Sequence, residues 1–291
     1  MKLITFTHEE RTRLGLVSDN SVVDLSVDAP DLPTNMLDFL CAGDPAMEAA
    51  RKALANAGPC IPIAQVRLEA PVMKPGKFLA IGLNYADHIE ESGIERPKHQ
   101  IWFNKQSTCV NGPFDPIDLP IASDMLDYEG ELGVVIGKRC RHVPLERAHE
   151  VIAGFTIVND VSVRDWQLRA QTFQIGKSFD THGPMGPYLV TTDDIEDPHK
   201  LDLKTWVNGE LRQHSNTQHL IFDCYQQIEH LTTAFTLEPG DVLATGTPAG
   251  VGMAMQPPSY LTEGDVVRIE IEGLGAIENA VAKESGITII E

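Results

Sequence analysis

The chain has 291 residues, of which 42% are hydrophobic, enough for one large domain or two ordinary ones with a sizeable core. Its formal charge of −19 argues against binding to nucleic acid or to an anionic membrane surface. The five cysteines are odd in number and scattered, which indicates reduced thiols. No apolar signal core precedes the first acids and no apolar run could span a membrane, so we expect a cytoplasmic protein.

The first 70 residues predict a small α+β module. Three short strand-like runs are separated by polar turns: 2–6, 13–17 and 21–25. Two helix-like segments follow: 35–41 and 45–57. Gly and Pro then punctuate the chain up to residue 77. We therefore expect a small N-terminal domain at 1–70 and a larger domain at 71–291.

A polar segment at 84–91 carries a histidine and a glutamate three residues apart. If this segment is helical, His88 and Glu91 are neighbours on one face, and the carboxylate can orient the imidazole and raise its basicity. Such a pair can activate a water molecule. The residues alone leave open an exposed surface pair without function.

Acids alternate in the segment 127–137, which otherwise reads as an apolar strand. Alternation places Asp127, Glu129 and Glu131 on one face. Their charges repel one another unless water screens them or a cation lies between them. Hard oxygen ligands of this kind suit Mg²⁺ or Mn²⁺ better than zinc. A solvated strand face is the alternative.

A second apolar run, 151–158, is followed by Asp160. An acid at the end of this run can approach Glu129 and Glu131 and supply a third oxygen ligand. Asn-Asp is also a signal for a turn or a helix cap. Farther on, Lys177 lies in a segment rich in Gly and Pro, where the backbone is locally fixed. Helices are expected from near Leu145 and across 219–234.

The glycine-rich segment 245–252 follows a strand-like run. Its backbone N–H groups and a threonine hydroxyl can hold an anion, although a tight turn is the alternative. It lacks the Gly-Lys-Ser/Thr ending of a phosphate loop, so nucleotide binding is not expected. The ten histidines show no recognisable zinc-ligand spacing.

Five segments, in this order, make the chain resemble the fumarylacetoacetate hydrolase family: 81–88, 128–138, 154–167, 176–187 and 240–252. They extend over roughly residues 75–285, so the resemblance is domain-wide. It implies a mixed β-sandwich roll of the C-terminal type of that family. Periodicity alone supports only a mixed, strand-rich α+β fold.

The resemblance also implies roles for particular residues. Glu129, Glu131 and Asp160 would be the ligands of Mg²⁺ or Mn²⁺, and Lys177 would lie beside the substrate oxygens. His88, oriented by Glu91, would activate water. The implied substrate contacts are Tyr85, Lys105, Gln167 and Thr247. Arg164 and Asp165 are interpreted as a structural pair under the metal site.

The expected activity is metal-dependent hydrolysis of a carbon–carbon bond in a 2,4-dioxo acid, an acylpyruvate or a 2,4-dioxo-3-deoxy sugar acid. The products would be pyruvate, or a substituted pyruvate, and a carboxylic acid. A small anionic 2-oxo acid is therefore the expected partner, and a homodimer the expected assembly. An oxaloacetate-type decarboxylase or a hydroxymuconate-type isomerase is the alternative at the same site. A non-catalytic metal- or ligand-binding protein is more remote. The sequence does not identify the substrate group beyond C4.

Overall fold

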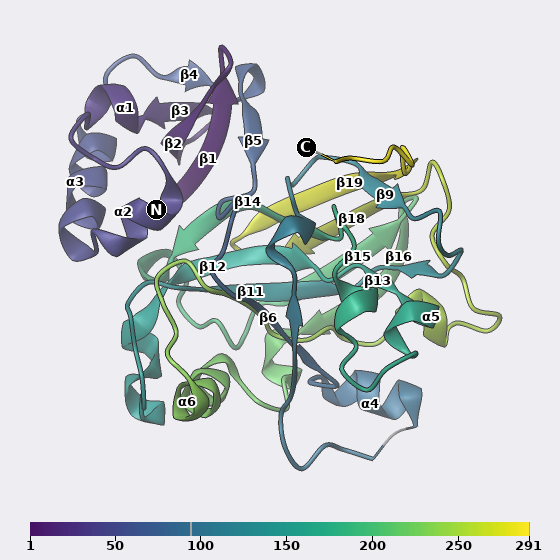
Figure 1. Ribbon diagram of the computed structural model, residues 1–291. Coiled ribbons are helices and arrows are strands. Elements are labelled where there is room, and N and C mark those ends of the chain that lie inside the picture. Colours follow the sequence, from purple (N-terminus) through teal and green to yellow (C-terminus); the bar gives the residue numbers. More distant parts are fainter. Residues whose placement is uncertain (94, 291) are drawn as a thin grey trace.

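The computed structural model describes residues 1–93 and 95–290. One long sheet connects the two ends of the molecule (Figure 1), in the order β4-β3-β2-β1-β14-β12-β11-β17-β6-β7. A five-stranded sheet, β16-β15-β18-β19-β9, packs against its central strands. Short helices and loops surround the sheets. The expected strand-rich α+β fold is confirmed.

The N-terminal part contains the short strands and helices expected from the sequence. Its strands are β1 (Lys2–His8), β2 (Arg11–Ser18), β3 (Ser21–Asp24), β4 (Ile61–Pro62) and β5 (Arg67–Glu69). Its helices are α1 (Leu25–Asp28), α2 (Met36–Cys41) and α3 (Asp44–Ala55). Strand β1 pairs with β14, with Lys2 opposite Val190, so the long sheet continues from this part into the rest of the chain. A division at residue 70 stays a prediction.

The remaining strands of the long sheet form the centre of the molecule: β6 (Phe78–Gly82), β7 (Ile101–Lys105), β8 (Val110–Asn111), β11 (Gly130–Ile136), β12 (Ile152–Asn159), β14 (Gly183–Thr191) and β17 (Val242–Ala244). Every residue of β11 and β12 is buried, which explains their nearly continuous apolar sequences. Leu132, Val134 and Ile136 belong to the core cluster shared with the second sheet, whereas Val135 packs in a cluster with the N-terminal helices. Both faces of β11 are therefore covered.

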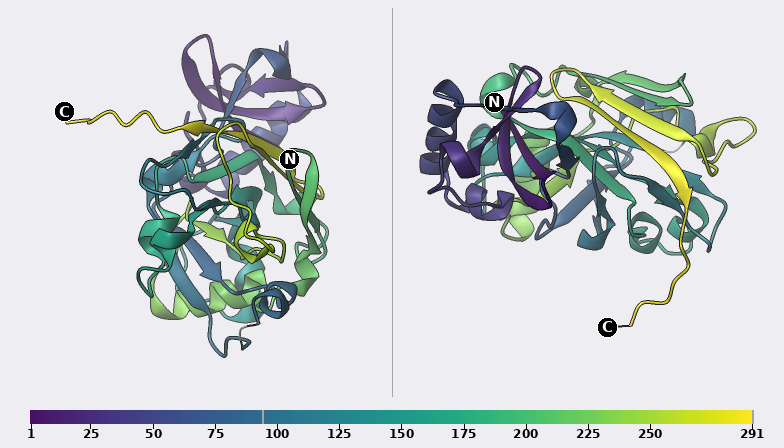
Figure 2. Two further views of the ribbon diagram at one scale, coloured as in Figure 1. Left: turned by 90° about the vertical axis from the view of Figure 1, so that its right-hand side faces the viewer. Right: turned by 90° about the horizontal axis from the view of Figure 1, so that it is seen from above.

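The second sheet and the smaller elements complete the fold. Its strands are β9 (Ile117–Leu119), β15 (Asp202–Val207), β16 (Glu210–Asn216), β18 (Val266–Ile271) and β19 (Gly275–Lys283). Strands β10 (Leu126–Asp127) and β13 (Ser162–Val163) pair with each other. The other α-helices are α4 (Ala86–Ser92), α5 (Arg164–Gln167) and α6 (Cys224–Ala234). After β19 the chain extends away from the body of the molecule (Figure 2).

Seven short 3-10 helices occur in the described chain: η1 (Ile63–Gln65), η2 (Ser107–Cys109), η3 (Leu145–Val151), η4 (Gln174–Lys177), η5 (Thr192–Asp194), η6 (Thr217–His219) and η7 (Gly252–Ala254). The helix expected from Leu145 is thus a 3-10 helix. The helix expected across 219–234 begins only at Cys224, because Asp223 caps it by accepting hydrogen bonds from two N–H groups of the first turn. No helix of the described residues is long and apolar enough to cross a membrane.

Candidate metal centre and active site

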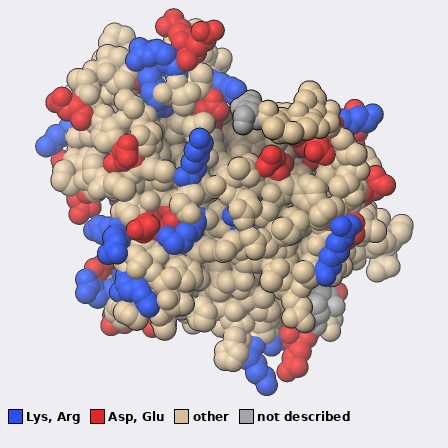
Figure 3. Space-filling view, viewed as in Figure 1, with Lys and Arg blue, Asp and Glu red and all other residues tan. Residues whose placement is uncertain are grey.

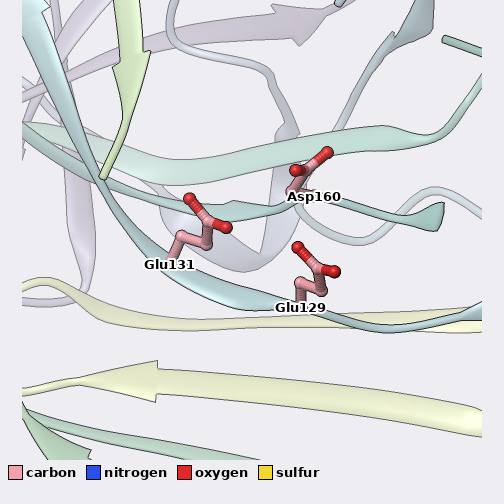
Figure 4. A group of neighbouring side chains, drawn as sticks. All are labelled: Glu129, Glu131 and Asp160. Carbon is pink, nitrogen blue, oxygen red and sulfur yellow. The ribbon is translucent and has the colours of Figure 1, made fainter. Parts of the chain in front are cut away.

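Three acids meet where β11 begins and β12 ends. Glu131 lies on β11, Glu129 directly precedes it, and Asp160 directly follows β12 (Figure 4). The two strands are antiparallel, and the N–H of Asp160 donates to the carbonyl of Glu129 at 2.9 Å. One carboxylate oxygen from each acid lies within 4.8 Å of the others. The structure therefore brings together the three ligands that the sequence predicted.

Buried cations surround these acids. Lys177 Nζ donates to Glu129 Oε2 at 2.7 Å and to Asp160 Oδ2 at 2.8 Å. Arg164 donates through Nη1 to Glu129 at 2.5 Å and through Nε to Asp127 at 2.8 Å. All five side chains are at least nine-tenths buried, so these charges are strongly coupled.

Positive charge is unevenly distributed over the three acids, and Glu131 has the least of it. Burial and the neighbouring Asp160 and Glu129 raise the pKa of Glu131 well above its ordinary value. Burial also acts to raise the pKa of Glu129, but Lys177 and Arg164 outweigh it and lower that pKa to about 2. Asp160 Oδ1 accepts no hydrogen bond from the described residues, although Lys105 Nζ lies 2.6 Å away. A further cation would keep Glu131 ionised, and three carboxylate oxygens suit a hard divalent ion.

The histidine–glutamate pair lies on helix α4 as expected. His88 Nδ1 lies 3.2 Å from Glu91 Oε2. The other oxygen of Glu91 accepts the N–H of Gly250 at 2.9 Å, which ties the helix to the glycine-rich loop. At the start of α4, Asp87 accepts a hydrogen bond of 2.7 Å from Ser215 of β16. These contacts fix the orientation of the imidazole relative to the second sheet.

A cavity of about 400 Å³ is lined by both His88 and Glu91 and by Glu129, one of the three acids. Its wall includes six of the residues predicted to form the site: His88, Glu91, Glu129, Gln167, Lys177 and Thr247. Arg164 also lines it, and Gln167 Oε1 accepts a 2.9 Å hydrogen bond from Arg164 Nη1. A ligand in this cavity can therefore contact His88 and Glu129 together, whereas Glu131 and Asp160 do not line it in the described chain.

The threonine of the glycine-rich loop already has partners for its hydroxyl group. Thr247 Oγ1 donates to the carbonyl of Gly130 at 3.0 Å and accepts from Gln213 Nε2 at 2.8 Å. A hydroxyl has one hydrogen to donate, so Thr247 would have to leave Gly130 to donate to a substrate carboxylate. The N–H of Gly246 likewise donates to Glu131 at 2.7 Å. In this structure the loop supports the strand that carries the acids.

Two predicted substrate contacts lie outside the cavity wall. Tyr85 is fully buried, and its hydroxyl has no hydrogen-bond partner among the described residues. Lys105 is buried on β7, where its ammonium donates to the carbonyl of Lys177 and pairs with Asp160. Neither residue lines the cavity in the described part of the chain. Lys105 thus contacts Asp160, a metal-ligand candidate, from outside the cavity wall.

The interpretation of Arg164 and Asp165 as a pair is wrong. Arg164 points to Asp127 and Glu129, whereas Asp165 accepts hydrogen bonds from Ser123 and Arg169. Consecutive residues at the start of α5 face different directions, so adjacency in sequence did not mean contact. Sequence reasoning also missed Gln213, whose side chain reaches from β16 to the glycine-rich loop, because no local pattern marks such a long-range contact.

The comparisons with known proteins agree with this geometry. The family model "Fumarylacetoacetate (FAA) hydrolase C-terminal" matches residues 77–282. The mitochondrial oxaloacetate tautomerase Fahd2a of Rattus norvegicus is 46% identical, over 97% of this chain and 91% of the relative. The mitochondrial oxaloacetate tautomerase FAHD2A of Homo sapiens is 42% identical, with the same coverage. The cytoplasmic location expected from the sequence is therefore not confirmed.

Solved structures extend the likeness to the whole fold. Maleylpyruvate hydrolase from Sphingobium sp. SYK-6 gives a TM-score of 0.82 at 34% identity, covering 98% of this chain and 100% of that one. A further structure of that hydrolase, in complex with manganese(II) ion and pyruvate, gives a TM-score of 0.80 at 32% identity, with the same coverage. The 5-carboxymethyl-2-hydroxymuconate delta-isomerase from Mycobacterium smegmatis gives 0.78 at 35%, again covering 98% and 100%. Together with the buried acid cluster, these findings confirm Mg²⁺ or Mn²⁺ as the cofactor class. The chain belongs to the fumarylacetoacetate hydrolase family.

Proposed function

We propose that this protein catalyses the enol–keto tautomerisation of oxaloacetate at its metal site. The observation that carries the proposal is the identity of 46% to an oxaloacetate tautomerase over 97% of the chain. Tautomerisation is an isomerisation, and so belongs with the isomerase alternative given in the sequence analysis. The comparisons support that alternative better than the carbon–carbon hydrolysis expected from the sequence.

The reaction is a proton transfer without cleavage of a carbon–carbon bond. The enol hydroxyl loses its proton, C3 gains one, and the C2–O bond becomes a carbonyl. The protein must therefore move a proton and hold the negative charge on the substrate oxygen. A bound Mg²⁺ or Mn²⁺ supplies Lewis-acid chemistry for oxygens near Glu129, Glu131 and Asp160.

His88 is the residue best placed to move the proton. When its Nδ1–H donates to Glu91, the imidazole takes the tautomer in which Nε2 is the basic atom. Its contact with Glu91 holds the ring in one orientation, so the same residue can accept a proton from oxygen and return it to carbon. The cavity lined by His88 is also lined by Glu129 of the acid cluster.

Lys177 is the residue best placed to hold the developing charge. Burial acts to lower its pKa, but Asp160 and Glu129 outweigh burial and raise it, so the amine stays protonated. Two of its three N–H bonds are directed to those acids, which leaves one for a substrate oxygen. Such a fixed donor stabilises an oxygen whose charge grows during the reaction.

Hydrolysis of a 2,4-dioxo acid is the second candidate. The His88–Glu91 pair favours it, because that pair could equally deprotonate water, and a maleylpyruvate hydrolase shares the fold. Product analysis separates the candidates. The protein with Mg²⁺ is given enol-oxaloacetate, and keto product is trapped by malate dehydrogenase while carbon dioxide is measured. Separately, acetylpyruvate is offered in ¹⁸O-water. Rapid keto formation without carbon dioxide supports the proposal. Labelled acetate formed without any tautomerisation would favour hydrolysis, and carbon dioxide release would favour decarboxylation.

A further inference from the structure

The wall of the active-site cavity is more apolar than oxaloacetate requires. Beside the charged groups of the site, seven large apolar side chains line it: Ile81, Leu83, Phe103, Leu168, Phe173, Val251 and Met253. We propose that this apolar wall binds an aryl or alkyl substituent on C3 of a 2-oxo acid, so that the enzyme also tautomerises enols such as that of phenylpyruvate. The inference rests on the proposed function and names a further substrate class for the same site.

The distribution of charge supports an uncharged substituent. The lysine and arginine side chains that line the cavity in the described chain are Lys177 and Arg164. Both are already paired with acids of the site. A carboxylate against the apolar wall would lose its water without gaining a new ion pair, whereas a phenyl ring would gain by leaving water.

The size of the cavity points the same way. Cavities of 300–1,000 Å³ typically hold ligands as large as drugs. The volume of about 400 Å³ found here lies in that range, and oxaloacetate is much smaller than such ligands. The space beyond the 2-oxo acid group is therefore large enough for a ring.

Two residues of the wall have a strained backbone conformation. Leu83 and Phe173 have φ angles of 55° and 58°, in the left-handed region that disfavours large side chains. The other non-glycine residues with positive φ in the described chain are polar or charged: Glu9, Glu10, Asp19, His142, Thr181 and Asn208. The Phe173 ring also meets Phe103 edge to face at 6.2 Å. Backbone strain of this kind concentrates at binding sites, where it positions a side chain for a ligand.

The reaction on such a substrate balances as it does for oxaloacetate. The enol O–H bond of phenylpyruvate breaks, a C3–H bond forms, and the C2–O bond becomes a carbonyl. No oxidant, reductant or second substrate takes part. The two acids differ only in the group on C3, a phenyl ring in one and a carboxylate in the other. Their comparison therefore isolates the effect of the wall.

The test measures kcat/KM for the enols of phenylpyruvate and oxaloacetate with the Mg²⁺-loaded protein. We expect wild-type values within about tenfold of each other. Leu83→Asn removes apolar surface but suits the left-handed backbone, so the fold should survive. It should lower the ratio of phenylpyruvate to oxaloacetate activity by about tenfold, as expected for loss of apolar contact. Met253→Lys adds a cation to the wall, and we expect it to lower this ratio about a hundredfold.

The matched control is Met73→Lys, the same substitution at a side chain that is 45% exposed and outside the cavity wall. It should leave the ratio unchanged. Turnover of oxaloacetate with none of phenylpyruvate would overturn the inference and leave the proposed function standing. A ratio that Leu83→Asn and Met253→Lys both leave at the wild-type value would overturn the role of the wall. Inactivity toward both enols would overturn the proposed function, and this inference with it.

Discussion

Lys177 donates a 2.8 Å hydrogen bond to Asp160, a residue that is also one of the three metal-ligand candidates. The same ammonium donates to Glu129, so one cation already contacts two of the three acids. The acids raise its pKa against the effect of burial, which keeps the amine protonated and non-nucleophilic. The arrangement indicates an electrostatic role for Lys177 and not a covalent one.

Replacement of Lys177 tests this role directly. Lys177→Met should lower kcat for enol-oxaloacetate by about 10² to 10³, the effect of losing one donor to a developing oxyanion, with a smaller change in KM. Borohydride added during turnover should leave no substrate attached to the protein, as measured by mass spectrometry. A reduced adduct at Lys177, or a variant with normal kcat, would contradict the assignment.

Metal binding should release protons. Because the pKa of Glu131 is raised by burial and by Asp160 and Glu129, the metal-free protein keeps a proton there to higher pH than an ordinary glutamate, and a divalent ion must displace that proton. Calorimetric titration with Mn²⁺ over a range of pH, in two buffers of different ionisation enthalpy, should show proton release on binding. Affinity should therefore rise with pH until Glu131 ionises without metal. Binding without proton release would show that the carboxyl group was already ionised.

The two residues of α4 should contribute unequally. His88→Ala should lower kcat for tautomerisation by about 10² to 10⁴, the range for loss of a positioned acid–base group. Glu91→Gln should cost less, since an amide oxygen can still accept the N–H of Gly250 while the charge beside the imidazole is lost. The kcat and KM of both variants with enol-oxaloacetate, measured under the same conditions, check this order. A loss in Glu91→Gln as large as the loss in His88→Ala would contradict it.

Stability should depend on His182, which lies outside the cavity wall. Burial lowers the pKa of His182 from 6.5 to about 4. Between pH 6.5 and 4 the unfolded chain therefore binds a proton at this histidine that the folded protein does not bind. The free energy of unfolding should fall as pH drops through this range, by up to about 3 kcal/mol. Above pH 6.5 this contribution should be constant. The pH slope of urea unfolding should be smaller in His182→Asn, and equal slopes would contradict a neutral buried histidine.

The sequence predicted best what depends on local periodicity. Alternation predicted that Glu129 and Glu131 point the same way, and their carboxylates do lie close together, while the spacing of His88 and Glu91 gave the contact seen in α4. The sequence also contains a signal for the start of α6, because Asp223 and Gln226 are spaced as in a capping box.

The positions of other site residues depend on contacts between distant segments of the chain and could not be predicted from local patterns. Lys105 was expected in the cavity, but pairing of β7 with β6 turns it toward Asp160. Thr247 was expected to hold substrate, but Gln213, from the second sheet, and Gly130 take its hydroxyl. No spacing rule predicts which partner a buried polar group finds across a sheet, because tertiary packing decides it.

The central claim is that the buried acids hold the metal that oxaloacetate tautomerisation requires. The most direct measurement follows the loss of enol-oxaloacetate absorbance with metal-free protein, with Mg²⁺ or Mn²⁺ restored, and with Glu131→Gln under the same conditions. Wild type should fall to the uncatalysed rate without metal and recover fully when metal is added, whereas the variant should not recover at the same metal concentration. Full activity in the metal-free protein, or normal metal-restored activity in Glu131→Gln, would contradict the claim.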